Sequence, residues 1–194
     1  MRTATLSRET AETQIRVALN IDGTGKSDID TGIGFFNHML ILFSNHGFLD
    51  LEIDCQGDIE VDFHHTVEDV GIVLGQAFKE ALGDKKGITR YATEHSPMDE
   101  ALSMITLDIS NRPYLHFQVD MPVEKVGPFD TELVEEFFRA FVNHAGVTLH
   151  INLLYGKNGH HIIESIFKGF GRIVDEATAV QERIHGVRST KGML

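Results

Sequence analysis

A His-His-x-x-Glu pattern that occurs twice constrains this chain more than any other feature. It begins at His64 and again at His160, and each copy opens an apolar stretch with helical spacing. Positions i and i+4 share one face of a helix, so His64 with Glu68, and His160 with Glu164, can each chelate a metal ion. Two amphipathic helices that merely begin with histidines would be the alternative. A pattern repeated in register favours an internal repeat with two metal sites.

The middle histidine of each copy needs a separate explanation. His65 and His161 point about a quarter-turn away from the i, i+4 face and cannot easily join the same ion. A duplicated unit resolves this if each copy gives its His/Glu pair to one metal and its second histidine to the other. Imidazole combined with carboxylate suits Mn, Fe, Co or Zn better than Ca or Mg.

Composition excludes several classes of protein. The 194 residues are 42% hydrophobic and 24% charged, which is ordinary for a soluble globular chain. No apolar run approaches the roughly 20 residues that span a bilayer, and the N-terminus has no signal-like apolar stretch. A formal charge of −12 argues against nucleic-acid binding. A lone cysteine, Cys55, suits a reducing compartment. We therefore expect a cytoplasmic protein with no membrane or nucleic-acid partner.

Periodicity predicts an α+β fold of two pseudo-symmetric β-β-α-β-α halves packed into one domain, each a small mixed sheet covered by helices. The halves span about residues 1–93 and 94–186, and a C-terminal tail follows. The first half contains strands over 3–9, 13–20 and 48–53 and helices over 35–45 and 64–82. The second half contains strands over 101–109, 113–119 and 147–154 and helices over 130–143 and 160–180.

The repeat predicts a further ligand for each metal. The separation that relates His46 to His144 also relates His38, on the first helix, to Glu136, on the matching helix. We therefore expect each of these two side chains to complete one metal site. The expected ligands of one ion are His38, His64, Glu68 and His161, and those of the other are His65, Glu136, His160 and Glu164. Each set leaves an octahedral position open for a substrate.

Basic residues are scattered, as an acidic chain would need them for an anionic ligand. They are Arg90, Arg112, Lys168, Arg188 and Lys191. Residues 188–192 form a compact, donor-rich tail in which a hydroxyl, backbone N–H groups and an ammonium could hold a phosphate. Their positions in the sequence alone do not indicate which of these cations bind the anionic ligand.

These features together resemble the imidazoleglycerol-phosphate dehydratase family of histidine biosynthesis. The matching blocks are residues 8–13, 34–40, 63–69, 97–100, 156–164 and 189–192. The resemblance implies two similar α+β halves and a homo-oligomer, a 24-mer built from trimers. It also implies two Mn²⁺ ions per active site, at sites shared between neighbouring subunits.

The family's functional positions carry over residue by residue. Its phosphate-binding positions fall on Arg90, Arg112, Lys168, Ser189 and Lys191. Its acid/base candidates fall on Glu12, His46 and Asp99. Three positions depart from the commoner pattern: Glu136 stands where many members have His, Asn37 where many have Asp, and Leu42 where many have a Gln that helps hold the phosphate.

The implied activity is that of a carbon–oxygen hydro-lyase acting on D-erythro-imidazole glycerol phosphate and forming imidazole acetol phosphate. The proton that is lost is not next to a carbonyl. We hypothesise that two metals stabilise the substrate ring as an imidazolate, which expels the hydroxyl through a diazafulvene. Glu12 would be the base, assisted by Asp99 and His46. A dinuclear metallohydrolase and a metal-storage assembly remain alternatives.

Overall fold

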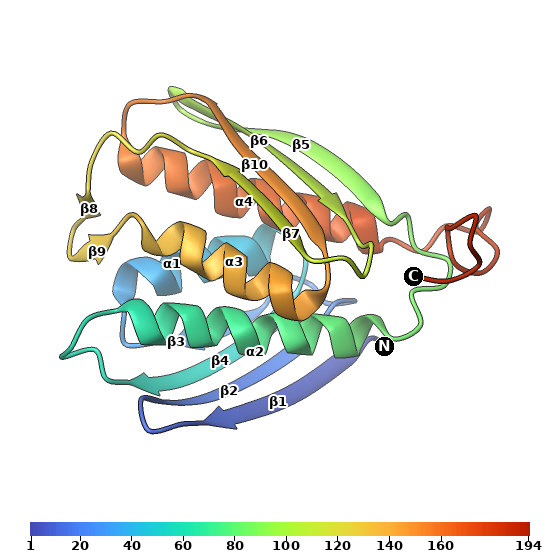
Figure 1. The fold of residues 1–194 in the computed structure, drawn as a ribbon, viewed down its shortest axis with the longest axis horizontal. Coiled ribbons are helices and arrows are strands. Elements are labelled where there is room, and N and C mark those ends of the chain that lie inside the picture. Colours follow the sequence, from blue (N-terminus) through green and yellow to red (C-terminus); the bar gives the residue numbers. More distant parts are fainter.

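The fold is a layer of helices between two β-sheets (Figure 1). The computed structural model describes residues 1–194. One four-stranded sheet comes from the first half of the chain and the other from the second half. This confirms the expected α+β class and the division into two similar halves packed together.

The two halves share one topology. The first half contains β1 Thr3–Glu9, β2 Thr13–Asn20, β3 Ser27–Asp30, α1 Gly34–His46, β4 Asp50–Gly57 and α2 His64–Leu82. The second half contains β5 Tyr91–Met98, β6 Ala101–Asp108, β7 Tyr114–Gln118, α3 Leu133–Ala145, β10 Thr148–Tyr155 and α4 Gly159–Thr178. A hairpin of β8 Lys125–Val126 and β9 Phe129–Asp130 is inserted before α3. The strand orders β1-β2-β4-β3 and β5-β6-β10-β7 are equivalent. In each sheet the last edge strand is parallel to its neighbour and the other pairs are antiparallel.

Each four-stranded sheet has one strand more than periodicity predicted, and the β8–β9 hairpin was not predicted either. β3 is short, polar and mostly exposed, so it carries no apolar alternation. β5 alternates, but its buried positions are the small residues Ala92 and Ser96, and Pro97 interrupts the pattern. Because β5 belongs to the second sheet and begins at Tyr91, the second half starts before residue 94.

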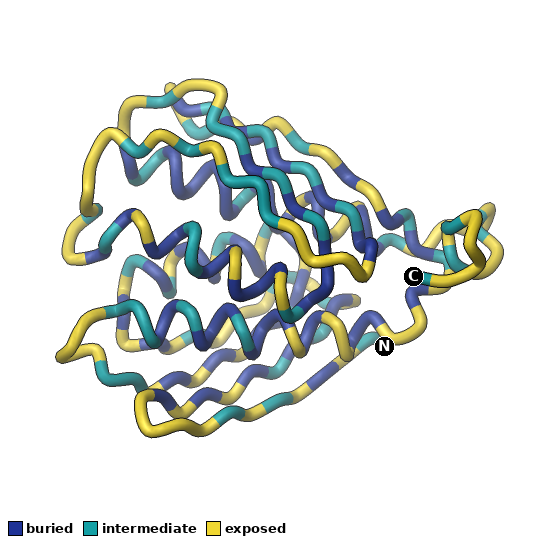
Figure 2. Tube along the Cα trace, viewed as in Figure 1, coloured by how far each residue is buried: buried dark blue, intermediate teal, exposed yellow.

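One hydrophobic core joins the halves. Buried positions alternate along β2, β4, β6 and β10, and the apolar helix faces meet them from between the sheets (Figure 2). A group of phenylalanines forms the centre, where Phe43 of α1 stacks on Phe170 of α4 with ring centroids 4.8 Å apart. Phe78 of α2 lies against Phe141 of α3 at 5.6 Å. None of the helices is both long enough and apolar enough to cross a membrane.

Close contacts at glycine define which helices are neighbours. A Cβ at Gly75 of α2 would lie 2.6 Å from the carbonyl oxygen of Phe141 on α3. A Cβ at Gly171 of α4 would lie 2.6 Å from the carbonyl oxygen of Phe43 on α1. Each helix of the first half therefore packs against a helix of the second half, α1 on α4 and α2 on α3.

Candidate functional site

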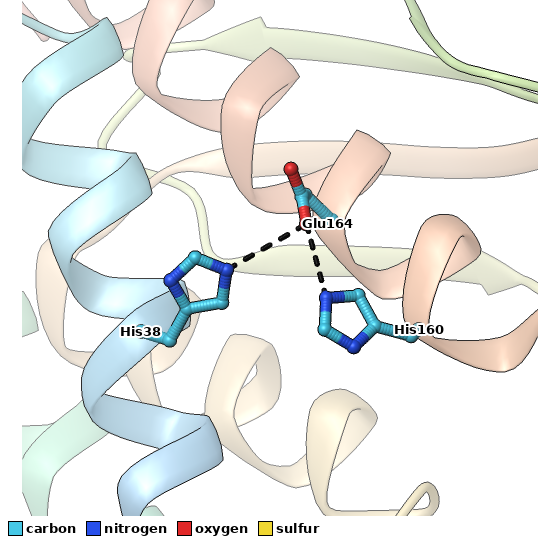
Figure 3. A group of neighbouring side chains, drawn as sticks. All are labelled: His38, His160 and Glu164. Atoms are coloured by element: carbon cyan, nitrogen blue, oxygen red, sulfur yellow. Dashed lines mark hydrogen bonds and ion pairs between the residues drawn. The ribbon is translucent and has the colours of Figure 1, made fainter.

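Three potential metal ligands converge between α1 and α4 (Figure 3). His38 comes from α1, and His160 and Glu164 come from the first turns of α4. Glu164 Oε2 lies 3.1 Å from His160 Nε2 and 3.6 Å from His38 Nε2. One ligand atom from each residue lies within 4.8 Å of the other two. The two histidines are partly exposed and Glu164 is buried, so the group opens to solvent on the histidine side.

The start of α4 is built to present these side chains. The Asn158 side chain caps the helix by accepting hydrogen bonds from the backbone N–H groups of His160, at 2.9 Å, and His161, at 3.3 Å. Glu164 lies one turn after His160, and its Oε1 accepts a hydrogen bond from Lys168 Nζ at 2.6 Å. Burial raises the pKa of Glu164, but Lys168 and His160 outweigh it, so the pKa lies below its usual range. Glu164 is therefore held as a carboxylate.

The structure corrects the expected grouping of the ligands. His38 was expected beside His64 and Glu68, and it lies instead with His160 and Glu164. The repeat offset identifies equivalent positions, but it does not say which helices are neighbours. Because α1 packs on α4, His38 faces the second copy of the pattern.

The first copy of the pattern forms its own pair on α2. His64 Nε2 lies 3.7 Å from Glu68 Oε2, one helical turn away. Glu136 lies in the first turn of α3, the helix that packs against α2, and its side chain makes no hydrogen bond or ion pair. Glu136 is therefore not part of the group that His160 and Glu164 form with His38, although it was expected beside them.

The middle histidines contact carboxylates instead of these groups. His65 Nδ1 lies 3.0 Å from Asp58 Oδ2, and its Nε2 lies 3.8 Å from Glu12 Oε1. The hydrogen bond to Asp58 raises the pKa of His65.

His161 has equivalent surroundings in the second half. Its Nδ1 lies 2.7 Å from Glu100 Oε2, and its Nε2 lies 3.9 Å from Asp99 Oδ2. The hydrogen bond between His161 and Glu100 raises the pKa of His161 and lowers the pKa of Glu100 to about 2.

The three acid/base candidates do not meet within one chain. Glu12 is beside His65, and Asp99 is beside His161. His46 lines a separate cavity of about 230 Å³ with Phe48, Glu94, Arg172, Asp175 and Glu176. Burial, and then the positive charges of Lys168 and Arg172, lower the pKa of His46.

The C-terminal tail closes a cationic cavity of about 550 Å³. Its lining includes four of the five expected phosphate-binding residues: Arg90, Arg112, Ser189 and Lys191. It also includes Arg188, which the sequence offered only as one of several scattered cations. Lys168 is not part of this cavity, because it extends from α4 to Glu164.

Asp108 organises the arginines of the cavity and was not expected from the sequence. It accepts from Arg90 Nε at 2.8 Å and from Arg90 Nη2 at 3.3 Å, and Arg112 Nη2 lies 3.6 Å away. The buried Arg90 also donates from Nη1 to the Arg188 carbonyl oxygen at 2.6 Å, which holds the tail in place. Asp108 lies near Arg90 because it pairs with Tyr91 across β5 and β6. The sequence could not indicate this contact, because periodicity did not reveal β5.

The His38 group fits a divalent transition metal. Two imidazoles and one carboxylate are ligands that Mn, Fe, Co and Zn accept, and their donor atoms already lie around one point. Together with the cationic cavity, the fold and the site define a duplicated α+β protein with a His/Glu centre and a pocket for an anionic group.

The chain belongs to the imidazoleglycerol-phosphate dehydratase family, whose model matches residues 31–174. Relatives of this name from Trichlorobacter lovleyi and Oceanobacillus iheyensis are each 61% identical to it; the matches cover 100% of this chain and 99% and 100% of the relatives. The crystal structure of the dehydratase from Staphylococcus aureus matches with a TM-score of 0.85 at 47% identity, over 92% of this chain and 99% of that one. The Pyrococcus furiosus dehydratase matches with a TM-score of 0.84 at 36% identity, over 97% and 100%. The protein is therefore an enzyme, a hydro-lyase of this family.

Proposed function

We propose that this protein dehydrates D-erythro-imidazole glycerol phosphate to imidazole acetol phosphate in L-histidine biosynthesis. Family membership over the whole chain supports the reaction. The observation that carries the proposal is the convergence of His38, His160 and Glu164 from two helices of different halves. This group gives a chain of this family a place for a divalent metal ion.

We propose two Mn²⁺ ions per active site. His38, His160 and Glu164 hold one, and His65 completes its ligands. His64 and Glu68 hold the other with Glu136, and His161 completes that set. A divalent metal bound there acts as a Lewis acid toward the ring nitrogens of the substrate.

Residues of the cationic cavity bind the phosphate. Arg112 and Lys191 supply charge at the exposed rim, and Ser189 supplies a hydroxyl donor. Arg90 is held by Asp108 and fixes the tail that carries Ser189 and Lys191. Lys168 pairs with Glu164 and is not part of the cationic cavity, so within one chain its positive charge acts at the metal ligands.

The remaining groups move protons. The ring-side hydroxyl leaves as water, the proton on the neighbouring carbon is removed, and the resulting enol tautomerises to the ketone. Glu12 is the base for that proton, with Asp99 and His46 assisting hydroxyl departure or reprotonation. General acid–base help of this kind is worth about 10²–10⁴-fold.

The active sites are shared between copies of the chain in a homo-oligomer of the family type. The support is geometric, since His65 and His161 lie outside the group formed by His38, His160 and Glu164. The net charge of −12 disfavours nucleic acid, so we limit the partners to the phosphorylated substrate and other copies of the chain. We place the reaction in the cytoplasm, where a lone thiol stays reduced.

The test is turnover of imidazole glycerol phosphate by chelator-stripped protein, with and without added Mn²⁺. Formation of imidazole acetol phosphate only after metal addition supports the dehydratase and its metal. No turnover by metal-loaded protein contradicts the proposal. Hydrolysis of simple phosphoesters would then indicate a dinuclear hydrolase, and metal release without turnover would indicate storage.

A further inference from the structure

The two middle histidines have matched carboxylate partners in the two halves of the molecule. Asp58 contacts His65 Nδ1 with both carboxylate oxygens, at 3.0 and 3.2 Å. Glu100 Oε2 lies 2.7 Å from His161 Nδ1. Neither carboxylate was among the residues expected to act in the site. Asp58 lies in the loop after β4 and Glu100 in the turn between β5 and β6, so the two halves place a carboxylate at the same ring nitrogen from different positions of the repeat.

These contacts determine which ring nitrogen is available. An ionised carboxylate only accepts hydrogen bonds, so the proton of each ring lies on Nδ1. A neutral imidazole with its proton on Nδ1 has its lone pair on Nε2, which is the nitrogen that can ligate a metal. In both histidines, Nε2 faces away from the hydrogen-bonded carboxylate, toward Glu12 or Asp99.

Hydrogen bonds hold the backbone of Asp58 and the carboxylate of Glu100. The Asp58 N–H donates to the Glu12 carbonyl oxygen at 3.1 Å, and the Asp58 carbonyl accepts from Val61 at 2.9 Å. Glu100 Oε1 accepts from the backbone N–H groups of Lys157, at 3.1 Å, and Asn158, at 2.8 Å. The loop that carries Asp58 and the side chain of Glu100 are therefore held in place by the protein itself.

We propose that Asp58 and Glu100 are positioning residues that fix the tautomer and ring orientation of His65 and His161, so that each Nε2 is presented to a divalent metal ion. Carboxylates that orient metal-bound histidines commonly change metal affinity 10–100-fold when they are removed. The inference rests on the proposed metal dependence, and it assigns a role to two residues outside the proposed metal ligands and substrate-binding residues.

The test is the Mn²⁺ dissociation constant of metal-stripped protein, followed by the electron paramagnetic resonance signal of free Mn²⁺. Asp58→Asn and Glu100→Gln keep the shape of each side chain, but their amides can donate to Nδ1 and favour the wrong tautomer. Each should raise the dissociation constant about 10–100-fold. Glu60→Gln and Glu124→Gln are matched controls, since both side chains are exposed and unpaired, and neither should change it.

A double-mutant cycle separates positioning from a general structural role. His161→Ala weakens Mn²⁺ binding by itself, and adding Glu100→Gln should then produce no further change. The same holds for Asp58→Asn added to His65→Ala. The proposal is overturned if each carboxylate substitution weakens Mn²⁺ binding in the alanine variants as much as it does in the unmodified protein. That result would show that the carboxylates do not act through the histidines.

Different results would contradict the positioning role and the metal dependence. If the unmodified protein binds Mn²⁺ and Asp58→Asn and Glu100→Gln bind it equally well, the positioning role is wrong and the proposed function stands. If the unmodified protein binds no Mn²⁺, the metal dependence in the proposed function fails, and the positioning role fails with it.

Discussion

At the scale of single residues, the anion pocket depends on one buried guanidinium. Arg90 is 7% exposed, and Asp108 accepts two of its hydrogen bonds. A buried charge that loses its partner keeps the full cost of its desolvation. The stability of the tail is therefore tied to Asp108, a carboxylate that does not line the anion pocket.

We predict that Asp108→Ala lowers the free energy of unfolding by about 1.5–3 kcal/mol, the range for hydrogen bonds to charged groups. Urea denaturation measures this change. Asp108→Asn keeps one hydrogen-bond acceptor, so it should lower the free energy of unfolding by less than Asp108→Ala does. Asp120→Ala is the control, since Asp120 is exposed and makes no ion pair. An Asp108→Ala protein as stable as the control would show that Arg90 finds other partners.

A second residue-scale prediction concerns acid. Asp22 accepts from the backbone N–H of Arg2 at 3.0 Å and from its guanidinium at 2.6 Å, and Arg2 also donates to the Thr178 carbonyl. The side-chain hydrogen bond from Arg2 lowers the pKa of Asp22. A lowered pKa in the folded state stabilises the protein above the unfolded value, near 3.9, and that stability is lost as pH falls through the folded pKa.

Asp22→Asn should therefore destabilise the protein at about pH 7 by less than about 1 kcal/mol, the value of an exposed pair. The difference in unfolding free energy between the two proteins should shrink below about pH 4, where the wild-type carboxyl also becomes neutral. Urea unfolding at several pH values measures it. A difference that stays constant down to the folded pKa and below would rule out the Arg2 pair as its source.

At the scale of elements, the long helices and the strands with large apolar residues were predictable, because buried side chains recur with clear periods. α2 was predicted over 64–82 and spans those residues. β3 and β5 were not predictable, since one is polar and the other buries only small residues. The strand predicted over 48–53 lies at Asp50–Gly57, because Gly47 and Phe48 are used in the turn that follows α1.

The α2–α3 contact gives a prediction at this scale. Gly75→Ala would place a methyl group 2.6 Å from a backbone oxygen of α3, an atom that cannot move without shifting the helix. Overpacking costs about 1–3 kcal/mol, against up to about 1 kcal/mol gained in helix propensity. We expect a net loss of about 1 kcal/mol in the free energy of unfolding, measured by urea denaturation.

Gly34→Ala is the matched control, because no atom lies within 4 Å of the added methyl group. It should be neutral or slightly stabilising, by less than about 1 kcal/mol. Equal effects of the two substitutions would mean that α2 and α3 do not need the close approach that Gly75 allows.

At the scale of the whole molecule, pairing of helices between the halves decides which ligands meet. The sequence predicted the ligand types and the repeat, since both follow from spacing along the chain. It did not predict that His38 meets His160 and Glu164, because that depends on α1 packing on α4. Contacts between distant elements are three-dimensional information that a local pattern does not contain. The same packing leaves His65 and His161 with no place in the His38 group of their own chain.

This arrangement predicts complementation between copies. His65→Ala leaves the His38 group intact, and Glu164→Gln leaves His65 intact, so each chain retains what the other has lost. If the sites are shared, coexpression of the two variants with different affinity tags should give mixed oligomers with restored dehydratase activity, although each variant alone is nearly inactive. Coexpression of Glu164→Gln with His38→Ala is the control, since both changes damage the same group and no mixture can rebuild it. Purified mixed oligomers without activity in the first pairing would show that His65 serves its own chain. Recovery confined to that pairing would show that one active site is assembled from two copies.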